Sequence, residues 1–215
     1  MFFMNAILIG IIVANVLISY KGFNDYAFFR KYEFHIGSIR SGEQIRMLSS
    51  GFLHVDIMHL VLNMYTLWIF APVVTDTLGV ISFAMIYFGS LIFGNLLTML
   101  FHKNDYSYRA VGASGAVTGI LYSAILLYPD MTLGIFFVLP MPAYLFGILY
   151  LLYSIYGMKA KNDNIGHTAH FGGAIGGYLI TLIKMPSLFS DNTLMVILLA
   201  VPIIILFGMA KLGKL

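Results

Sequence analysis

Residues 78–101 read LGVISFAMIYFGSLIFGNLLTMLF, an uncharged apolar run that is long enough to cross a lipid bilayer. A helix needs about 20 mostly apolar residues to span a hydrocarbon core roughly 30 Å thick. The run is continuously apolar, which favours a transmembrane helix over the alternating pattern of a membrane β-barrel strand. This stretch therefore predicts a chain that crosses a membrane as a helix.

Six further stretches qualify as spans or come close, and none has a charged residue in its interior. They lie at about 2–20, 57–74, 113–128, 132–156, 168–183 and 193–210. The connections between them are short and polar, except for the long loop 21–56, which mixes charged and aromatic residues. That composition suits a segment lying in the membrane interface, where we expect the loop.

The overall composition agrees with a membrane protein. Of the 215 residues, 60% are hydrophobic and only 10% are charged, and the mean hydropathy is +0.91. A soluble domain carries roughly a quarter of its residues as charged side chains, so a soluble enzyme is excluded. Cysteine is absent, which excludes disulfides and a cysteine nucleophile. The basic residues are scattered, so the net charge of +3 predicts no nucleic-acid partner.

Polar residues at hydrophobic depth are the informative ones in such a protein. His59 and Asn63 are four residues apart, so they share one helix face near the start of the second stretch. Ser114 begins the fourth stretch, and His170 lies near the start of the sixth. If all seven stretches span, the second, fourth and sixth helices enter from the same side. The four polar residues are then expected to meet at one membrane face.

This set of residues suits acyl transfer. A serine hydroxyl becomes a nucleophile when a neighbouring histidine accepts its proton. The N–H of Ser114, at a helix start, and the side chains of His59 and Asn63 can donate to an oxyanion. Small residues spaced by four let helix backbones approach closely and so bring Ser114 to His170. The small residues expected to pack near the site are Gly112, Gly115, Gly119, Gly173 and Gly177.

The motifs around these residues resemble those of the rhomboid family of intramembrane serine proteases. The resemblance covers roughly residues 40 to 180, and its pieces occur in order on consecutive even-numbered spans. They are Gly-Ala-Ser-Gly at 112–115, His-x-x-x-Asn at 59–63 and Ala-His-x-x-Gly-x-x-x-Gly at 169–177. His54 and the Glu43-Gln-Ile-Arg46 segment also look like family features.

The resemblance implies an all-α polytopic membrane protein with a rhomboid-like six-helix core at residues 1–183. Residues 184–215 would form a linker and an additional C-terminal transmembrane helix. The loop around Arg46 would brace the core, and the fifth span would be the gate through which a substrate helix enters. Substrates would be single-span membrane proteins, held in the lipid bilayer and cut without a metal or other cofactor.

The resemblance also implies a Ser-His dyad without a catalytic aspartate. Ser114 would be the nucleophile and His170 the general base. His59, Asn63 and the Ser114 amide would form the oxyanion hole.

Two positions depart from the family pattern. Ile45 stands where the family often has tryptophan before the loop arginine, which puts the anchoring of that loop in doubt. Thr118 stands four residues after the nucleophile, where many members place an aromatic ring that stacks on the histidine. The orientation of His170 is therefore unexplained by sequence. Tyr122, one turn further along, is a candidate substitute but lies deeper.

Other interpretations of the same residues compete with this one. Ser114 alone suits helix packing, and His59 and Asn63 alone suit interhelical hydrogen bonds. His167 and His170 are three residues apart, but no acidic residue stands beside them, which disfavours a metal site. A non-catalytic rhomboid-like protein that binds or escorts client helices is the main alternative function. A transporter would be expected to have a charged or proline-broken midplane site, and no charge accompanies the prolines of the fifth and seventh stretches.

The basic residues and the resemblance disagree about orientation. Eleven of the twelve Lys and Arg residues lie in the first, third and fifth loops and the C-terminus, on the side of the expected site. The positive-inside rule places that side in the cytoplasm, whereas the resemblance implies an extracytoplasmic opening. Acidic residues neutralise part of the first loop, and we therefore follow the resemblance. We expect a multi-pass protein of the plasma or inner membrane of a prokaryote.

Overall fold

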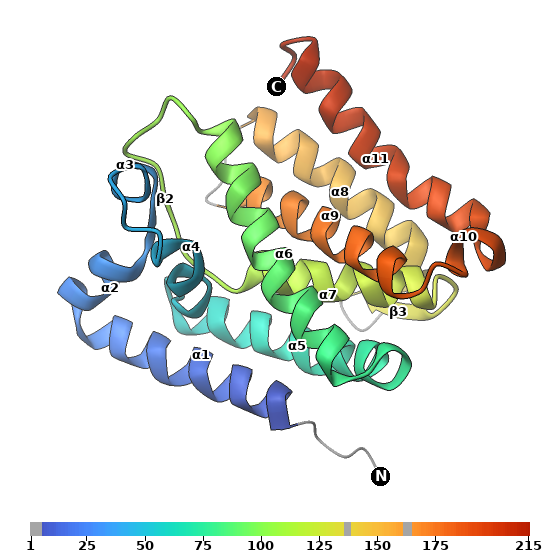
Figure 1. Cartoon of the computed structure of the whole chain (residues 1–215), viewed down its shortest axis with the longest axis horizontal. Helices are drawn as coiled ribbons and strands as arrows, with labels where there is room; N and C mark the ends of the chain where they lie inside the picture. Colours follow the sequence, from blue (N-terminus) through green and yellow to red (C-terminus); the bar gives the residue numbers. More distant parts are fainter. Residues whose placement is uncertain (1–5, 136–138, 161–164) are drawn as a thin grey trace.

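The computed structural model describes residues 6–135, 139–160 and 165–215, and it is a bundle of helices (Figure 1). The long helices are α1 (Ala6–Asn24), α5 (Ile57–Leu78), α6 (Val80–Phe101), α7 (Ser114–Leu127), α8 (Ala143–Ala160), α9 (His167–Lys184) and α11 (Thr193–Lys211). Among the described residues, α1, α5, α6, α8 and α11 are long and apolar enough to cross a membrane. The predicted all-α polytopic membrane fold is confirmed. The first residues of the predicted span 2–20, and part of the connection after α8, lie outside the described residues.

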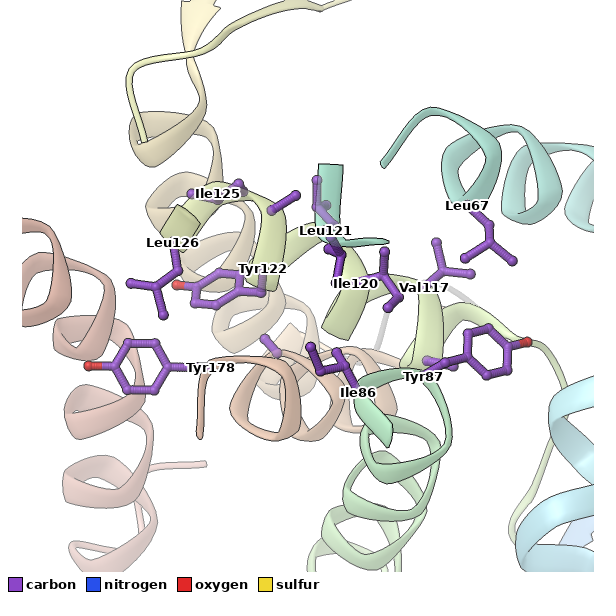
Figure 2. Packing of buried hydrophobic residues seen from close by; sticks show 14 of the residues in the cluster. Leu67, Ile86, Tyr87, Val117, Ile120, Leu121, Tyr122, Ile125, Leu126 and Tyr178 are labelled. Carbon is purple, nitrogen blue, oxygen red and sulfur yellow. The ribbon is translucent and has the colours of Figure 1, made fainter. Parts of the chain in front are cut away.

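Helix α7 is the centre of the bundle. Every residue from Gly115 to Leu127 is buried, whereas Ser114 at its start is only half-buried. Figure 2 shows Val117, Ile120 and Leu121 of α7 among apolar side chains from neighbouring helices. Surrounding helices therefore shield all of α7 except the end that carries the predicted nucleophile.

The predicted small-residue contact between α7 and α9 is present. A Cβ atom added at Gly173 would collide with the backbone of Gly115, and one added at Gly177 would collide with the backbone of Gly119. The two helix backbones therefore touch directly, as small-residue motifs allow. Gly172 of α9 makes a similar approach to α6, where an added Cβ would lie 2.6 Å from the Phe93 carbonyl oxygen.

The long loop between α1 and α5 is folded rather than irregular. It contains α2 (Tyr26–Tyr32), β1 (Phe34–His35), α3 (Ile36–Arg40), α4 (Arg46–Ser49) and the 3-10 helix η1 (Ser50–Phe52). The buried Arg46 guanidinium donates to the carbonyl oxygens of Arg30 and Glu33, at 2.8 and 2.9 Å, and to the Glu43 carboxylate at 2.7 Å. Arg46 thus anchors the loop from within, although the preceding Ile45 side chain is exposed.

The predicted fifth span, 132–156, is placed incorrectly at its start. Residues of that stretch form a hairpin of β3 (Thr132–Ile135) and β4 (Leu139–Pro142), and helix α8 begins only at Ala143. Pro140 and Pro142 have no N–H to donate to a helix, and each disfavours the helical conformation of the residue before it. The helix instead extends further at its other end, to Ala160.

Helix α11 packs on the bundle after the short helix α10 (Leu188–Asp191). The Tyr122 hydroxyl of α7 donates to the Leu199 carbonyl at 3.1 Å, and the Tyr178 hydroxyl of α9 donates to the Val196 carbonyl at 2.8 Å. Figure 2 shows Tyr122 and Tyr178 among the buried apolar residues of the interior. The predicted C-terminal helix is therefore joined to the core by hydrogen bonds as well as by apolar contact.

Candidate active site

A tight turn leads from strand β2 (Arg109–Ala110) into helix α7 and presents Ser114. Gly112 has a φ angle of 130°, in a region of backbone space that favours glycine. Its N–H donates to the Ser50 carbonyl at 3.0 Å, and the Ala113 N–H donates to Nε2 of His54 at 3.3 Å. Strand β2 also pairs with β1 of the long loop. The loop therefore holds the turn that carries Ser114.

His54, which accepts the Ala113 N–H in this turn, is buried. Its Nδ1 lies 2.9 Å from the hydroxyl of Ser19, which itself donates to the Phe52 carbonyl at 2.9 Å. That hydroxyl is thus free only to accept, so Nδ1 carries the proton and Nε2 accepts from Ala113. Burial, reinforced by the neighbouring His59 imidazole, lowers the pKa of His54 to about 3 and keeps it neutral. This agrees with a structural rather than a catalytic histidine.

His59 and Ser114 face one small space beside Gly112. A Cβ atom added at Gly112 would lie 2.7 Å from Cε1 and 2.9 Å from Nε2 of His59, and 3.7 Å from the Ser114 hydroxyl oxygen. Any residue with a side chain at position 112 would fill that space. The structure therefore brings the predicted oxyanion donor His59 to the predicted nucleophile.

Asn63 lies one turn after His59 and faces a cavity of about 210 Å³ that also contains Ser114. Its amide nitrogen donates to the His59 carbonyl at 2.8 Å, which uses one of two N–H bonds and leaves the other for the cavity. The cavity lies between α5, α7 and α8, and its walls are mostly apolar. It is lined by Leu62, Asn63, Thr66, Ser114, Val117, Thr118, Leu121, Phe146 and Tyr150.

Helix α9 carries His170 against the start of α7. A Cβ atom added at Gly115 would lie 3.1 Å from the Ala169 carbonyl oxygen, so the residues next to Ser114 and His170 are in backbone contact. Among the described residues, no hydrogen bond joins the Ser114 hydroxyl to the His170 imidazole. The two predicted dyad residues therefore sit on touching backbones, without a direct bond in this structure.

Tyr150 of α8 contacts His170 and was not predicted from the sequence. Its hydroxyl lies 2.9 Å from Nδ1 of His170 and 3.3 Å from the hydroxyl of Thr118. Its ring lies nearly parallel to the imidazole, at 20° with centroids 6.0 Å apart. Tyr122, the candidate substitute for the missing aromatic, instead bonds to α11. In the sequence, nothing distinguishes Tyr150 from the other tyrosines of its stretch.

Comparison with known proteins identifies the family. The Rhomboid domain matches residues 41–187, which include the turn at Ser114 and the residues around it. This chain belongs to the rhomboid family. The matched part contains His54, His59, Asn63, Ser114 and His170, whereas α1 and α11 lie outside it. The chain is accordingly a helical, multi-pass membrane protein of the rhomboid family.

Several relatives carry rhomboid names. "RHOMBOID-like protein 12, mitochondrial" of Arabidopsis thaliana is 28% identical over 185 residues, covering 78% of this chain and 55% of the relative. "Putative rhomboid protease YdcA" of Bacillus subtilis is 31% identical over 147 residues, covering 67% of this chain and 69% of the relative. "Rhomboid protein 1, mitochondrial" of Saccharomyces cerevisiae is 29% identical over 141 residues, covering 63% of this chain and 40% of the relative. The chain spans about half the length of the Arabidopsis relative.

Proposed function

We propose that this rhomboid family member is an intramembrane serine endopeptidase that cleaves transmembrane segments of single-span membrane proteins. In this proposal Ser114 is the nucleophile, and His170 is the general base. His59, Asn63 and the Ser114 N–H form the oxyanion hole. The observation that carries the proposal is that the His59 ring and the Ser114 hydroxyl both lie within 4 Å of one point beside Gly112.

The proposed reaction is an acyl transfer to serine. The Ser114 hydroxyl gives its proton to Nε2 of His170 while its oxygen attacks the scissile carbonyl carbon. Donors at the oxyanion hole stabilise the charge that develops on the carbonyl oxygen. The imidazolium then protonates the leaving amide nitrogen, and water hydrolyses the acyl-enzyme by the same steps. Because Nδ1 of His170 is bonded to Tyr150, Nε2 is the nitrogen assigned to this exchange.

The cavity beside Ser114 is the proposed position of the scissile segment. Its walls come from α5, α7 and α8, and they combine apolar side chains such as Leu62 and Phe146 with the polar groups of Asn63 and Ser114. An unwound piece of a substrate helix brings both apolar side chains and unpaired backbone groups. Such a segment is matched by an apolar wall with a few polar groups close to the nucleophile.

Cleavage by purified protein in detergent tests the proposal. The protein should cut a single-span test substrate, and Ser114→Ala and His170→Ala should each abolish cutting while the protein stays folded. Asn63→Ala should lower kcat/KM. The expected loss corresponds to about 2–4 kcal/mol of transition-state stabilisation, the magnitude of one oxyanion donor. Ser107→Ala, at an exposed serine in the loop before β2, is the matched control and should cut normally.

A serine-directed fluorophosphonate probe separates an enzyme from a binder. The proposal expects labelling that requires Ser114. Substrate binding without Ser114-dependent labelling would contradict it and would favour a rhomboid-like binder or escort of membrane helices.

We also propose an extracytoplasmic opening and a prokaryotic plasma or inner membrane. The proposal opposes the bias of the basic residues, so it needs a direct test. Reporter fusions placed after Leu215 should report an extracytoplasmic C-terminus, because α11 returns the chain to the face that carries Ser114. A cytoplasmic reporter signal would reverse the orientation without affecting the proposed chemistry.

A further inference from the structure

Tyr150 contacts two other rings, Phe146 and the imidazole of His170, which is the proposed general base. Phe146, one turn earlier on α8, stacks on Tyr150 at 16° with centroids 5.9 Å apart. Tyr150 in turn lies nearly parallel to the His170 imidazole, and its hydroxyl is 2.9 Å from Nδ1. The tyrosine ring is thus in contact with the rings of both Phe146 and His170.

The Tyr150 hydroxyl also reaches a second polar group. The hydroxyl of Thr118, on α7, lies 3.3 Å away. Thr118 is buried, with 4% of its surface exposed. A phenol can donate one hydrogen bond and accept others, so Tyr150 can link an imidazole N–H to a threonine oxygen. The order of donors in this chain determines which nitrogen of His170 carries the proton.

We infer that Tyr150 is a positioning residue that holds His170 in the tautomer able to accept the Ser114 proton. Nδ1–H of His170 donates to the Tyr150 oxygen, and the Tyr150 O–H donates to Thr118. That order leaves Nε2 without a proton, which is the form the proposed transfer from Ser114 requires. The opposite order would place the proton on Nε2 and leave no base for Ser114. This inference rests on the proposed function, since it assigns a task to the residue beside the proposed base.

The short side chain at position 118 is part of the same arrangement. An aromatic residue there would occupy the space that Thr118 leaves for the Tyr150 hydroxyl. The ring that contacts His170 comes instead from α8, which packs beside α7 and α9. The dyad therefore lies on two helices whose backbones touch, and a third helix sets the orientation of the base.

Tyr150→Phe is the direct test, because it keeps the ring and removes the hydroxyl. Loss of a hydrogen bond that strengthens as His170 gains charge is expected to lower kcat about tenfold. KM should change less than twofold, because the apolar ring still lines the cavity. The second-order rate of Ser114 labelling by a fluorophosphonate should fall by about the same factor as kcat. Tyr156→Phe, at an exposed tyrosine on the same helix, is the matched control and should leave both rates unchanged.

Thr118→Val provides a second, independent variant of similar shape. It removes the acceptor for the Tyr150 O–H, so the phenol hydrogen turns toward Nδ1, and kcat should fall about three- to fivefold. Because both residues act through one hydrogen-bond chain, the double variant should be no slower than Tyr150→Phe alone, within twofold. Independent structural roles would instead multiply the two losses.

The outcomes separate this inference from the proposed function. If the wild type cuts, Ser114→Ala is silent and Tyr150→Phe cuts at the wild-type rate or faster, the positioning role is overturned and the protease proposal stands. Multiplying losses in the double variant would also overturn it. A wild type that neither cuts nor is labelled at Ser114 would overturn both.

Discussion

A buried imidazole is one of the groups that hold the turn before Ser114. His54 accepts the Ala113 N–H, and it can do so only while Nε2 has no proton. Burial lowers the pKa of His54 to about 3 in the folded protein, whereas an unfolded histidine titrates near 6.5. Because the folded value is the lower one, the contribution of His54 to stability is complete above about pH 6.5. It is lost progressively as the pH falls from there toward about 3.

We therefore expect the free energy of unfolding to fall between pH 7.5 and 5.0, by at most about 1.4 kcal/mol per pH unit from His54. In His54→Gln this fall should be shallower, because one titrating group is gone while the amide oxygen still accepts from Ala113. Thermal unfolding in detergent at several pH values measures the difference. The range stays above pH 5, where carboxylates add little. Parallel curves for the two proteins would contradict the prediction.

At the scale of the helices, the direct contact between α7 and α9 holds Ser114 and His170 near each other. A Cβ atom at Gly177 would enter the backbone of Gly119, and backbone cannot move aside as a flexible side chain does. Gly177→Ala should therefore push the two helices apart and lower the free energy of unfolding by about 1–3 kcal/mol, a typical effect of overpacking. Cleavage should fall as well, since His170 lies two turns earlier on the same helix.

Gly10→Ala is the matched control for this substitution. Among the described residues nothing lies within 4 Å of a Cβ atom placed at Gly10 on α1, so the change should be neutral or stabilise by up to about 1 kcal/mol. Thermal unfolding of both variants in the same detergent gives the comparison. Equal free energies of unfolding for Gly177→Ala and Gly10→Ala would contradict the prediction, because they would mean that α7 and α9 can move apart without destabilising the protein.

The helices themselves differ in how well the sequence predicts them. Long uncharged apolar runs mark α5, α6 and α11 directly, because lipid demands such runs. The hairpin before α8 was missed, since Pro140 and Pro142 lie inside an equally apolar stretch and hydropathy does not distinguish strand from helix. Site residues follow a similar rule. Polar residues at hydrophobic depth predict Ser114 and His170 as candidates, whereas Tyr150 is one of 14 tyrosines and its contacts with Thr118 and His170 appear only in the folded chain.

At the scale of the whole molecule, the family core and the added helix α11 form one folded unit. Two tyrosine hydroxyls of the core, Tyr122 and Tyr178, donate to carbonyl oxygens of α11. Tyr122 is fully buried, and Gly147 of α8 lies close to Leu199, so α11 covers α7, α8 and α9 together. Removing α11 would leave both hydroxyls without these acceptors and would expose apolar side chains of the core that are now covered.

We expect Tyr122→Phe and Tyr178→Phe each to lower the free energy of unfolding by about 0.5–1.5 kcal/mol, the net value of one hydrogen bond. The double variant should lose more stability than either single variant, because the two hydroxyls have different acceptors. Removal of residues 193–215 should cost more than the double variant, since apolar contact is lost as well. Thermal unfolding measures all four proteins, and Tyr156→Phe serves as the control. A truncated protein as stable as the full chain would mean that α11 attaches to the core without stabilising it.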